Sequence, residues 1–103
     1  MVNEYTRYRI PVDKRTAFLS DYTQAAEHLR ASPACLGYDL SQCEEEQDCY
    51  ILRIIWQSTA AHLEIFRGSD DFRHFLPLIK AYIPCIEEMR HYAPTELHWT
   101  RLP

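Results

Sequence analysis

Large apolar side chains recur at every second position in two neighbouring segments, residues 34–43 and 49–57. Alternation with this period is typical of a β-strand with one buried face. The acidic, turn-like segment 44–48 between them predicts a β-hairpin in which Asp39 lies opposite Arg53. We expect the even-numbered face to be buried beneath helices; its residues are Leu36, Tyr38, Leu40, Tyr50, Leu52, Ile54 and Trp56.

The opposite face of this hairpin is mixed rather than polar, because Ile51 and Ile55 lie on either side of Arg53. A chain of 103 residues is too short for helices to cover both faces of its sheet. A second copy of the same sheet would cover this face, and twofold pairing is the commonest oligomeric arrangement. We therefore expect a homodimer through the sheet face; the alternative is a monomer with an unusually apolar solvent face.

One further strand and a helix precede the hairpin. Residues 4–11 are rich in β-forming residues and end at a proline. Residues 12–32 carry Phe, Tyr, Ala and Leu at helical spacing, with Asp13 as a plausible N-cap and Pro33 as the residue that stops the helix. The strand's core-facing side chains, by the same alternation, are Thr6, Tyr8 and Ile10.

Two more helical segments follow the hairpin. Ser58 caps the first, which ends at Gly68 and turns Ala61, Leu63 (or His62) and Phe66 inward. The second begins after another serine cap and is distorted at Pro77. Residues 85–94 either continue that helix or form a last strand, which their spacing does not decide. The tail 95–103 looks extended.

The order of these elements is β-α-β-β-α-β, with the second helical element broken in two. This order predicts an α+β, ferredoxin-like fold in which helices cover one face of a four-stranded antiparallel sheet. We find no internal repeat and no linker, so we expect a single domain over residues 1–103, with its core at about 4–94.

Composition and charge narrow the function classes. The net charge of −4, without a basic stripe, argues against nucleic-acid binding. The N-terminus lacks a signal-peptide pattern, and no apolar run approaches the roughly 18 residues of a membrane span. We therefore expect a cytoplasmic protein with no membrane partner. The four cysteines form no C-x-x-C pair, so we expect no metal site; whether Cys43 and Cys49 pair across the hairpin stays open.

Four stretches resemble one known family. "SPACLGYDL", "IIWQSTAAHLEIF", "SDDFRHF" and "EMRHYAP" are similar to the motifs of the antibiotic biosynthesis monooxygenase (ABM) domain. The resemblance implies a dimeric α+β barrel, a fourth strand at residues 85–94, and a pocket between the sheet and the helices of one subunit. Family members include quinol and anthrone-type monooxygenases that use dioxygen without a metal or flavin, haem-degrading enzymes, and domains with no known reaction.

An oxygenase without a cofactor must hold an electron-rich aromatic substrate, remove its proton and exclude water. Histidine is the usual base near neutral pH, and flat aromatic walls suit a planar substrate. We expect Trp56, His62 and His74 to be catalytic, although each has a structural alternative as a core or surface residue. The expected substrate-binding residues, which could equally be ordinary packed aromatics, are Tyr8, Tyr38, Phe66, Phe75 and Tyr82.

Two other functions remain open. Haem-degrading members of the family carry a first-strand asparagine, the strand-end tryptophan and a histidine that ligates iron. Here the corresponding positions are Tyr8, Trp56 and Leu76, so only the tryptophan is kept and haem breakdown is less favoured. His74 or Tyr82 could ligate only from a shifted helix. The second alternative is a non-catalytic accessory module that binds a small aromatic ligand or haem.

Overall fold

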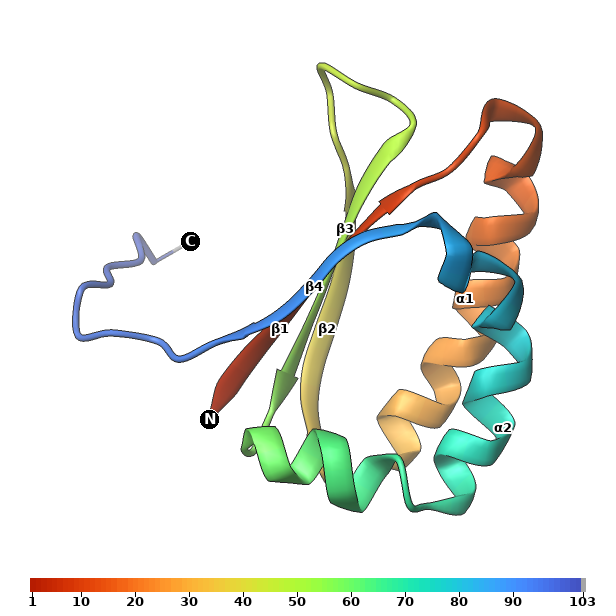
Figure 1. Cartoon of the computed structure of the whole chain (residues 1–103). Coiled ribbons are helices and arrows are strands. Elements are labelled where there is room, and N and C mark those ends of the chain that lie inside the picture. The colour runs from red at the N-terminus through yellow and green to blue at the C-terminus, as the bar shows by residue number, and fades with distance from the viewer. Residues whose placement is uncertain (103) are drawn as a thin grey trace.

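The structure is a computed structural model that describes residues 1–102. Four strands and two α-helices make up the domain, with shorter helical turns between them (Figure 1). In chain order the elements are β1 (Val2–Arg9), η1 (Val12–Lys14), α1 (Arg15–Ala31), β2 (Cys35–Gln42), β3 (Cys49–Trp56), η2 (Ala61–Phe66), α2 (Asp70–Ile79), η3 (Lys80–Cys85) and β4 (Ile86–Tyr92).

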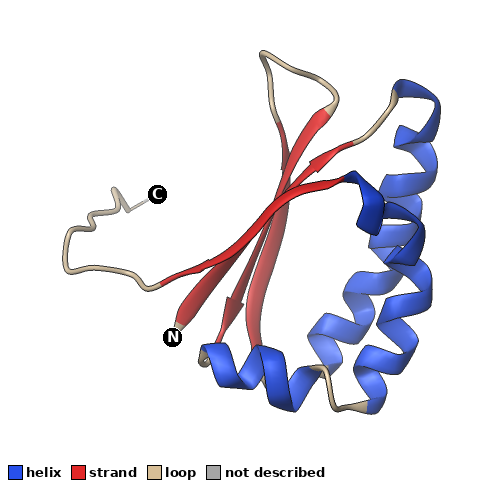
Figure 2. Ribbon diagram, in the orientation of Figure 1, coloured by secondary structure: helices blue, strands red, loops and turns tan. Residues whose placement is uncertain are grey.

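The strands form one sheet in the order β2-β3-β1-β4, and every neighbouring pair is antiparallel. All the helices lie on the same face of this sheet, with α1 and α2 side by side (Figure 2). The predicted α+β, ferredoxin-like architecture is confirmed. Residues 86–92 form the edge strand β4, as the family resemblance implied.

The hairpin of β2 and β3 has the predicted register. Asp39 pairs with Arg53 and the two form an ion pair, while Leu40 lies opposite Leu52. The prediction for Leu36 was wrong: its side chain is 52% exposed. An irregularity between Cys35 and Gly37 shifts the register there, and such a bulge turns the extra side chain away from its expected face.

Serine caps begin the helical segments after β3, but no side-chain cap begins α1. Asp13 lies within the η1 turn, and Lys14 occupies the N-cap of α1 without a side-chain hydrogen bond, so the predicted Asp13 cap was wrong. Ser58 Oγ accepts the backbone N–H of Ala61, and Ser69 Oγ accepts that of Phe72, as predicted. The inward face of α1 carries Phe18, Tyr22, Ala25, Ala26 and Leu29.

The segment after β3 forms a π-helix, in which the Arg67 N–H bonds to the His62 carbonyl five residues back. This winding buries His62 and leaves Leu63 41% exposed. Gly68 follows because a Cβ there would lie 2.8 Å from the Glu64 carbonyl oxygen. Pro77 lies inside α2, which ends two residues later in the 3-10 turn η3.

Outside these elements the chain is extended or irregular. Residues 93–102 leave the sheet after β4 and run away from the domain (Figure 1). All four cysteines, including Cys43 and Cys49, are free thiols. Among residues 1–102, no helix combines the length and the apolar character that a bilayer crossing requires.

Candidate functional site

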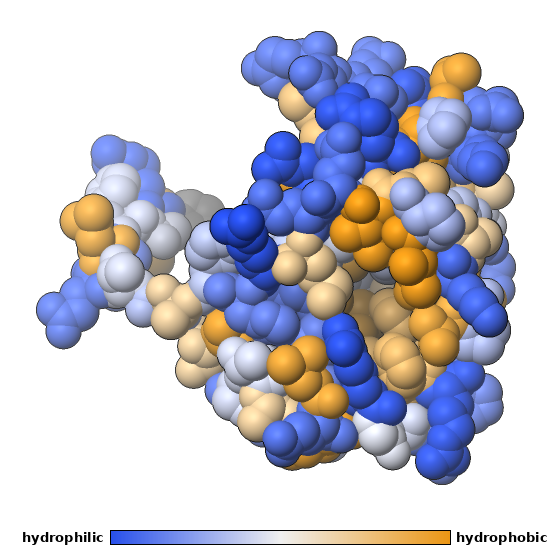
Figure 3. All heavy atoms as spheres, viewed as in Figure 1, coloured by the Kyte–Doolittle hydropathy of each residue, from blue (hydrophilic) through white to orange (hydrophobic). Residues whose placement is uncertain are grey.

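A cavity of about 290 Å³ lies between the sheet and the helical layer. The surface is hollowed there, and apolar residues gather around the hollow (Figure 3). Ile83 and Met89 line this cavity and are 44% and 39% exposed. The volume is at the lower end of the range for small-molecule pockets. Its floor is the inner face of β1 and β3, and its roof comes from α1, α2 and η2.

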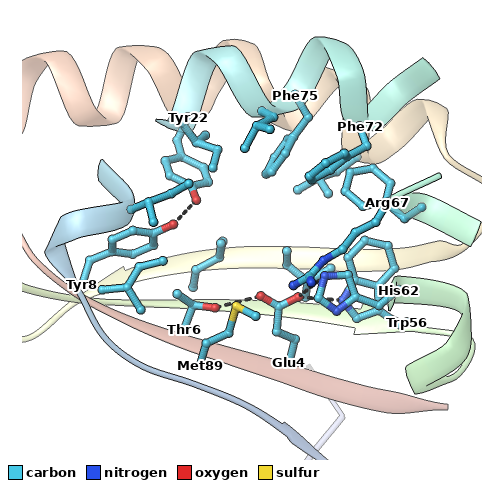
Figure 4. Close-up of a pocket in the computed structure, with 18 residues that line it drawn as sticks. Glu4, Thr6, Tyr8, Tyr22, Trp56, His62, Arg67, Phe72, Phe75 and Met89 are labelled. Carbon is cyan, nitrogen blue, oxygen red and sulfur yellow. Dashed lines mark hydrogen bonds and ion pairs between the residues drawn. The ribbon is translucent and has the colours of Figure 1, made fainter. Parts of the chain in front are cut away.

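Glu4 supplies a carboxylate to the cavity floor. The alternation of β1 places Glu4, Thr6 and Tyr8 on the same inward face, and Glu4 is only 4% exposed. Its Oε1 accepts the Trp56 indole N–H at 2.9 Å, and its Oε2 accepts the Thr6 hydroxyl at 2.8 Å. One donor from the same strand and one from the neighbouring strand β3 therefore hold this buried acid in place, as the dashed lines in Figure 4 show.

His62 lies flat against the Trp56 indole at the same end of the cavity. The two ring centroids are 4.5 Å apart and the planes differ by 7°. His62 Nε2 is 3.4 Å from Glu4 Oε1, and its Nδ1 is 2.8 Å from Nε2 of His91 on β4. The imidazole is thus fixed by a stacking partner on one face and by polar partners at both ring nitrogens.

Burial is the main cause that lowers the pKa of His62 to about 4. Nearby Arg67 and His91 lower this pKa further, and the Glu4 carboxylate raises it. At neutral pH the His62 ring is consequently uncharged, so one ring nitrogen keeps a lone pair. This lone pair can accept a proton, and the neighbouring Glu4 carboxylate stabilises the imidazolium that would form.

Arg67 carries a positive charge to the cavity mouth. The π-helix brings both His62 and Arg67 to the cavity lining, and the Arg67 side chain extends toward Glu4 and His62 (Figure 4). Within residues 1–102 its guanidinium forms neither a hydrogen bond nor an ion pair. A guanidinium without a protein partner is available to an anionic ligand.

Two tyrosine hydroxyls meet at the other end of the cavity. Tyr8 of β1 and Tyr22 of α1 share a short hydrogen bond, and both side chains are buried. Burial raises the pKa of Tyr8 to about 12 and raises that of Tyr22 as well, so both are neutral at pH 7. One hydroxyl donates to the other, which leaves one O–H free to donate to a ligand oxygen.

Aromatic and aliphatic side chains form the remaining walls. Phe66, Phe72 and Phe75 contact one another in edge or stacked geometries, with centroids 5.5–6.4 Å apart. Leu76, on the next turn of α2, also lines the cavity. These side chains give the planar apolar walls that an aromatic ligand needs. Because Leu76 has no donor atom, the haem-ligand position of the family carries no ligand here.

The structure brings five of the eight candidate site residues to this cavity: Trp56, His62, Tyr8, Phe66 and Phe75. His74 lies exposed on the outer side of α2, stacks on His28 and contacts the Asp70 carbonyl through Nδ1. Tyr38 accepts a hydrogen bond from Arg30 outside the cavity. Tyr82 is buried but donates its hydroxyl to Asp21. These three residues are not cavity-lining residues.

Sequence reasoning missed several polar groups that the structure places at the cavity end. Glu4, Thr6 and Arg67 line the cavity, as does Tyr22, and His91 contacts the ring of His62. The alternation of β1 was a signal for Glu4, because the strand that places Tyr8 inward also places Glu4 inward. No local pattern indicated His91, since its role depends on a contact with a residue 29 positions earlier.

We compared the sequence with those of known protein families and proteins. The family model described as antibiotic biosynthesis monooxygenase matches residues 1–78. An uncharacterized protein of Bacillus subtilis (strain 168), YczJ, is 26% identical over 92 residues, which is 89% of this chain and 97% of that protein.

Solved structures share the fold. A Bordetella bronchiseptica protein, described as a candidate antibiotic biosynthesis monooxygenase, superposes with a TM-score of 0.76 at 22% identity, covering 91% of this chain and 96% of its own. Rv0793 from Mycobacterium tuberculosis gives a TM-score of 0.73, also at 22% identity, with 92% and 95% coverage. At these identities the likeness concerns the fold.

Proposed function

Because the chain belongs to the antibiotic biosynthesis monooxygenase family, we propose that it oxidises a quinol or other polyphenolic aromatic with dioxygen, without a resident cofactor. One observation carries this proposal. A single aromatic-walled cavity holds a proton-accepting pair, Glu4 and His62, at one end and a hydroxyl donor pair, Tyr8 and Tyr22, at the other.

The substrate ring lies between the phenylalanine wall of α2 and the inner face of the sheet. The free O–H of the Tyr8–Tyr22 pair donates to one substrate oxygen, which directs a second hydroxyl toward Glu4 and His62. Stacking on Trp56 prevents His62 from turning, so the proton acceptor keeps its orientation. The apolar lining limits the water that enters with the substrate.

The first chemical step removes a hydroxyl proton from the substrate. The proton passes to the Glu4–His62 pair, and the resulting phenolate is stabilised by the Arg67 guanidinium at the mouth. The electron-rich phenolate then reduces dioxygen. One oxygen atom enters the ring and the other leaves as water, and the quinol itself supplies all the electrons, so no external reductant is needed.

A homodimer through the outer sheet face accompanies this function in our proposal. Ile51 and Ile55 on that face are only half-buried within one chain. The tail beyond β4 carries three apolar residues that are at least 73% exposed, namely Leu97, Trp99 and Leu102. A second copy would cover both the face and the tail. Light scattering tests this: a particle of about twice 12.2 kDa supports it, and one chain mass contradicts it.

Dioxygen uptake tests the enzymatic proposal. Purified protein is mixed with a panel of hydroquinones and anthrones in an oxygen electrode, with His62→Gln as the site variant and His74→Gln as the matched control. We expect uptake above the buffer rate for wild type and for His74→Gln, and at least a tenfold loss for His62→Gln. Saturable binding of these compounds without any uptake would contradict the proposal and favour the non-catalytic binding module.

A further inference from the structure

Three potential metal ligands converge at the polar end of the cavity. Glu4, His62 and His91 each offer one donor atom, and these atoms all lie within 4.8 Å of one another. Glu4 and His62 are buried and His91 is half-buried. The sequence analysis expected no metal site, because the three residues are far apart in the chain and form no motif.

The fold itself creates this convergence. Glu4 and His91 are register partners on the neighbouring antiparallel strands β1 and β4, so their side chains leave the same face of the sheet side by side. His62 reaches them from the π-helix η2, where it is held by its stack on Trp56. Three elements therefore contribute one ligand each, as rigid metal sites require.

We propose that Glu4, His62 and His91 bind a divalent first-row transition-metal ion. Two imidazoles and one carboxylate are a donor set used for zinc and for non-haem iron, with further coordination positions left open. This inference goes beyond the proposed function, whose chemistry uses Glu4 and His62 without a metal; a bound ion would occupy both side chains.

The separation between the donor atoms of Glu4 and His62 suits a common ion. Bond lengths of about 2.0–2.1 Å place the ligand atoms of a tetrahedral ion roughly 3.3–3.4 Å apart. His62 Nε2 and Glu4 Oε1 are 3.4 Å apart, which is long for a hydrogen bond but matches this spacing. His91 Nε2 lies 2.8 Å from Nδ1 of His62, the other ring nitrogen, so the His91 side chain has to move to share an ion with Nε2 of His62. It lies on an edge strand and is half-buried, which leaves room for this movement.

The surroundings of the three ligands support the same conclusion. The Thr6 hydroxyl and the Trp56 indole N–H hold the Glu4 carboxylate, which is the role that outer partners have around metal ligands. Glu4 and His62 both line the cavity, so an open coordination position faces the space available to a small ligand. The ion would thus be reached through the cavity.

Arg67 opposes a cation at this place, and this gives the proposal a sharp test. The Arg67 side chain extends toward Glu4 and His62 (Figure 4), so its charge also acts on an ion bound there. Glu4 supplies one negative charge, and Arg67 has no protein partner within residues 1–102. Removing the positive charge in Arg67→Gln should strengthen metal binding several-fold.

The experiment titrates tag-free, chelator-treated protein with Zn²⁺ by calorimetry and with Co²⁺ by absorption. We expect one saturable ion per chain in wild type. His91→Gln should weaken binding at least tenfold, and Arg67→Gln should tighten it. His74→Gln is the control, because His74 stacks on His28, with ring centroids 5.5 Å apart, and does not line the cavity. The metal affinity of this variant should stay within twofold of wild type.

A second readout does not depend on any one variant folding. Co²⁺ should quench the fluorescence of Trp56 in a Trp99→Phe background, because the indole lies 4.5 Å from the His62 ring. The proposal would be overturned if wild type showed no saturable binding or no quenching, or if wild type and His91→Gln bound the metal equally well. It would also be overturned if His74→Gln abolished binding, because the metal would then occupy an adventitious site. No substrate is present, so the outcome is independent of the oxygenase proposal.

Discussion

Two histidines on neighbouring helical segments have opposite surroundings. His62, on the π-helix after β3, is 5% exposed, lies against Trp56 and contacts Glu4 and His91. His74, on α2, is exposed and contacts only its own helix and His28. Both lie on predicted helical segments after the hairpin, and the sequence analysis expected both to be catalytic.

The difference shows what places a side chain in this cavity. His62 comes six residues after the last residue of a central strand, so the strand end and the first helical turn hold it over the sheet. The inward positions of α2 are taken by Phe75 and Ile79, and His74 is next to one of them in sequence but on the other side of the helix. Whether a histidine reaches the cavity therefore depends on how its helical segment is held over the sheet, and the aromatic residues near it in sequence do not predict this.

Removing the stacking partner of His62 should have the largest effect. Trp56 is fully buried, so Trp56→Ala should lower the free energy of unfolding by about 3–5 kcal/mol through cavity formation and the loss of its contacts. Trp99→Ala, at a residue 73% exposed, should change it by less than about 0.5 kcal/mol. Urea denaturation of both variants measures this, and equal effects would contradict the packing described here.

The direct comparison of the two histidines comes next in size. His62→Gln should lower kcat/KM for a quinol at least tenfold, about 1.4 kcal/mol of transition-state stabilisation. His74→Gln should leave it within twofold, because His74 does not line the cavity. Steady-state oxygen uptake gives both values, and a larger loss in His74→Gln would reverse our assignment.

The pH dependence of stability distinguishes the same two residues. Burial lowers the pKa of folded His62 to about 4, below its ordinary value of 6.5. Between pH 4 and 6.5 the unfolded chain binds more protons at His62 than the folded chain does. The stability of the folded state at this residue is therefore complete above pH 6.5 and is lost as the pH falls toward 4. From pH 7 to pH 5, the free energy of unfolding of wild type should therefore fall by on the order of 1 kcal/mol more than that of His62→Gln, after allowing for solvent screening.

Urea denaturation in metal-free buffer at both pH values measures this loss. His74→Gln serves as the control and should follow wild type across the range. A wild type that keeps its stability relative to His62→Gln at pH 5 would show that the imidazole is not buried in its neutral form.

The smallest predicted effect concerns the far end of the cavity. Tyr22→Phe removes one of two hydrogen-bonded hydroxyls and should cost about 0.5–1.5 kcal/mol of stability. It should raise KM for a quinol more than it lowers kcat, because the hydroxyl pair binds the substrate at the cavity end opposite the proton acceptor. An effect on kcat alone would place the Tyr8–Tyr22 pair in the chemistry instead.

Much of the fold followed from short-range patterns. Alternation predicted the hairpin, its register and its buried face, and serine caps marked where the later helical segments begin. Leu36 was misplaced because a bulge between Cys35 and Gly37 interrupts the alternation; Gly37, an isolated glycine within the strand, was the available signal for it. Residues 85–94 were ambiguous by spacing, since the choice between helix and strand depended on pairing with β1.

The candidate site was only half predictable. Trp56 was predicted from its place at a strand end, and His62 from its family-like segment one turn into the next helix. Glu4 was missed because a charged residue near the start of a strand is usually solvated, whereas here the Trp56 indole and the Thr6 hydroxyl donate hydrogen bonds to it. His91 was missed because its importance comes from cross-strand pairing with Glu4, which the topology sets.

The Trp56 indole N–H offers the most direct measurement of the central claim, that this cavity receives an aromatic ligand beside His62. Its proton is donated to Glu4 at the cavity floor, while Trp99 lies in the exposed tail and serves as an internal reference. In a heteronuclear NMR titration with a redox-stable hydroxyaromatic, the Trp56 indole signal should shift saturably and the Trp99 signal should stay. A titration that shifts only Trp99, or neither signal, would contradict the account.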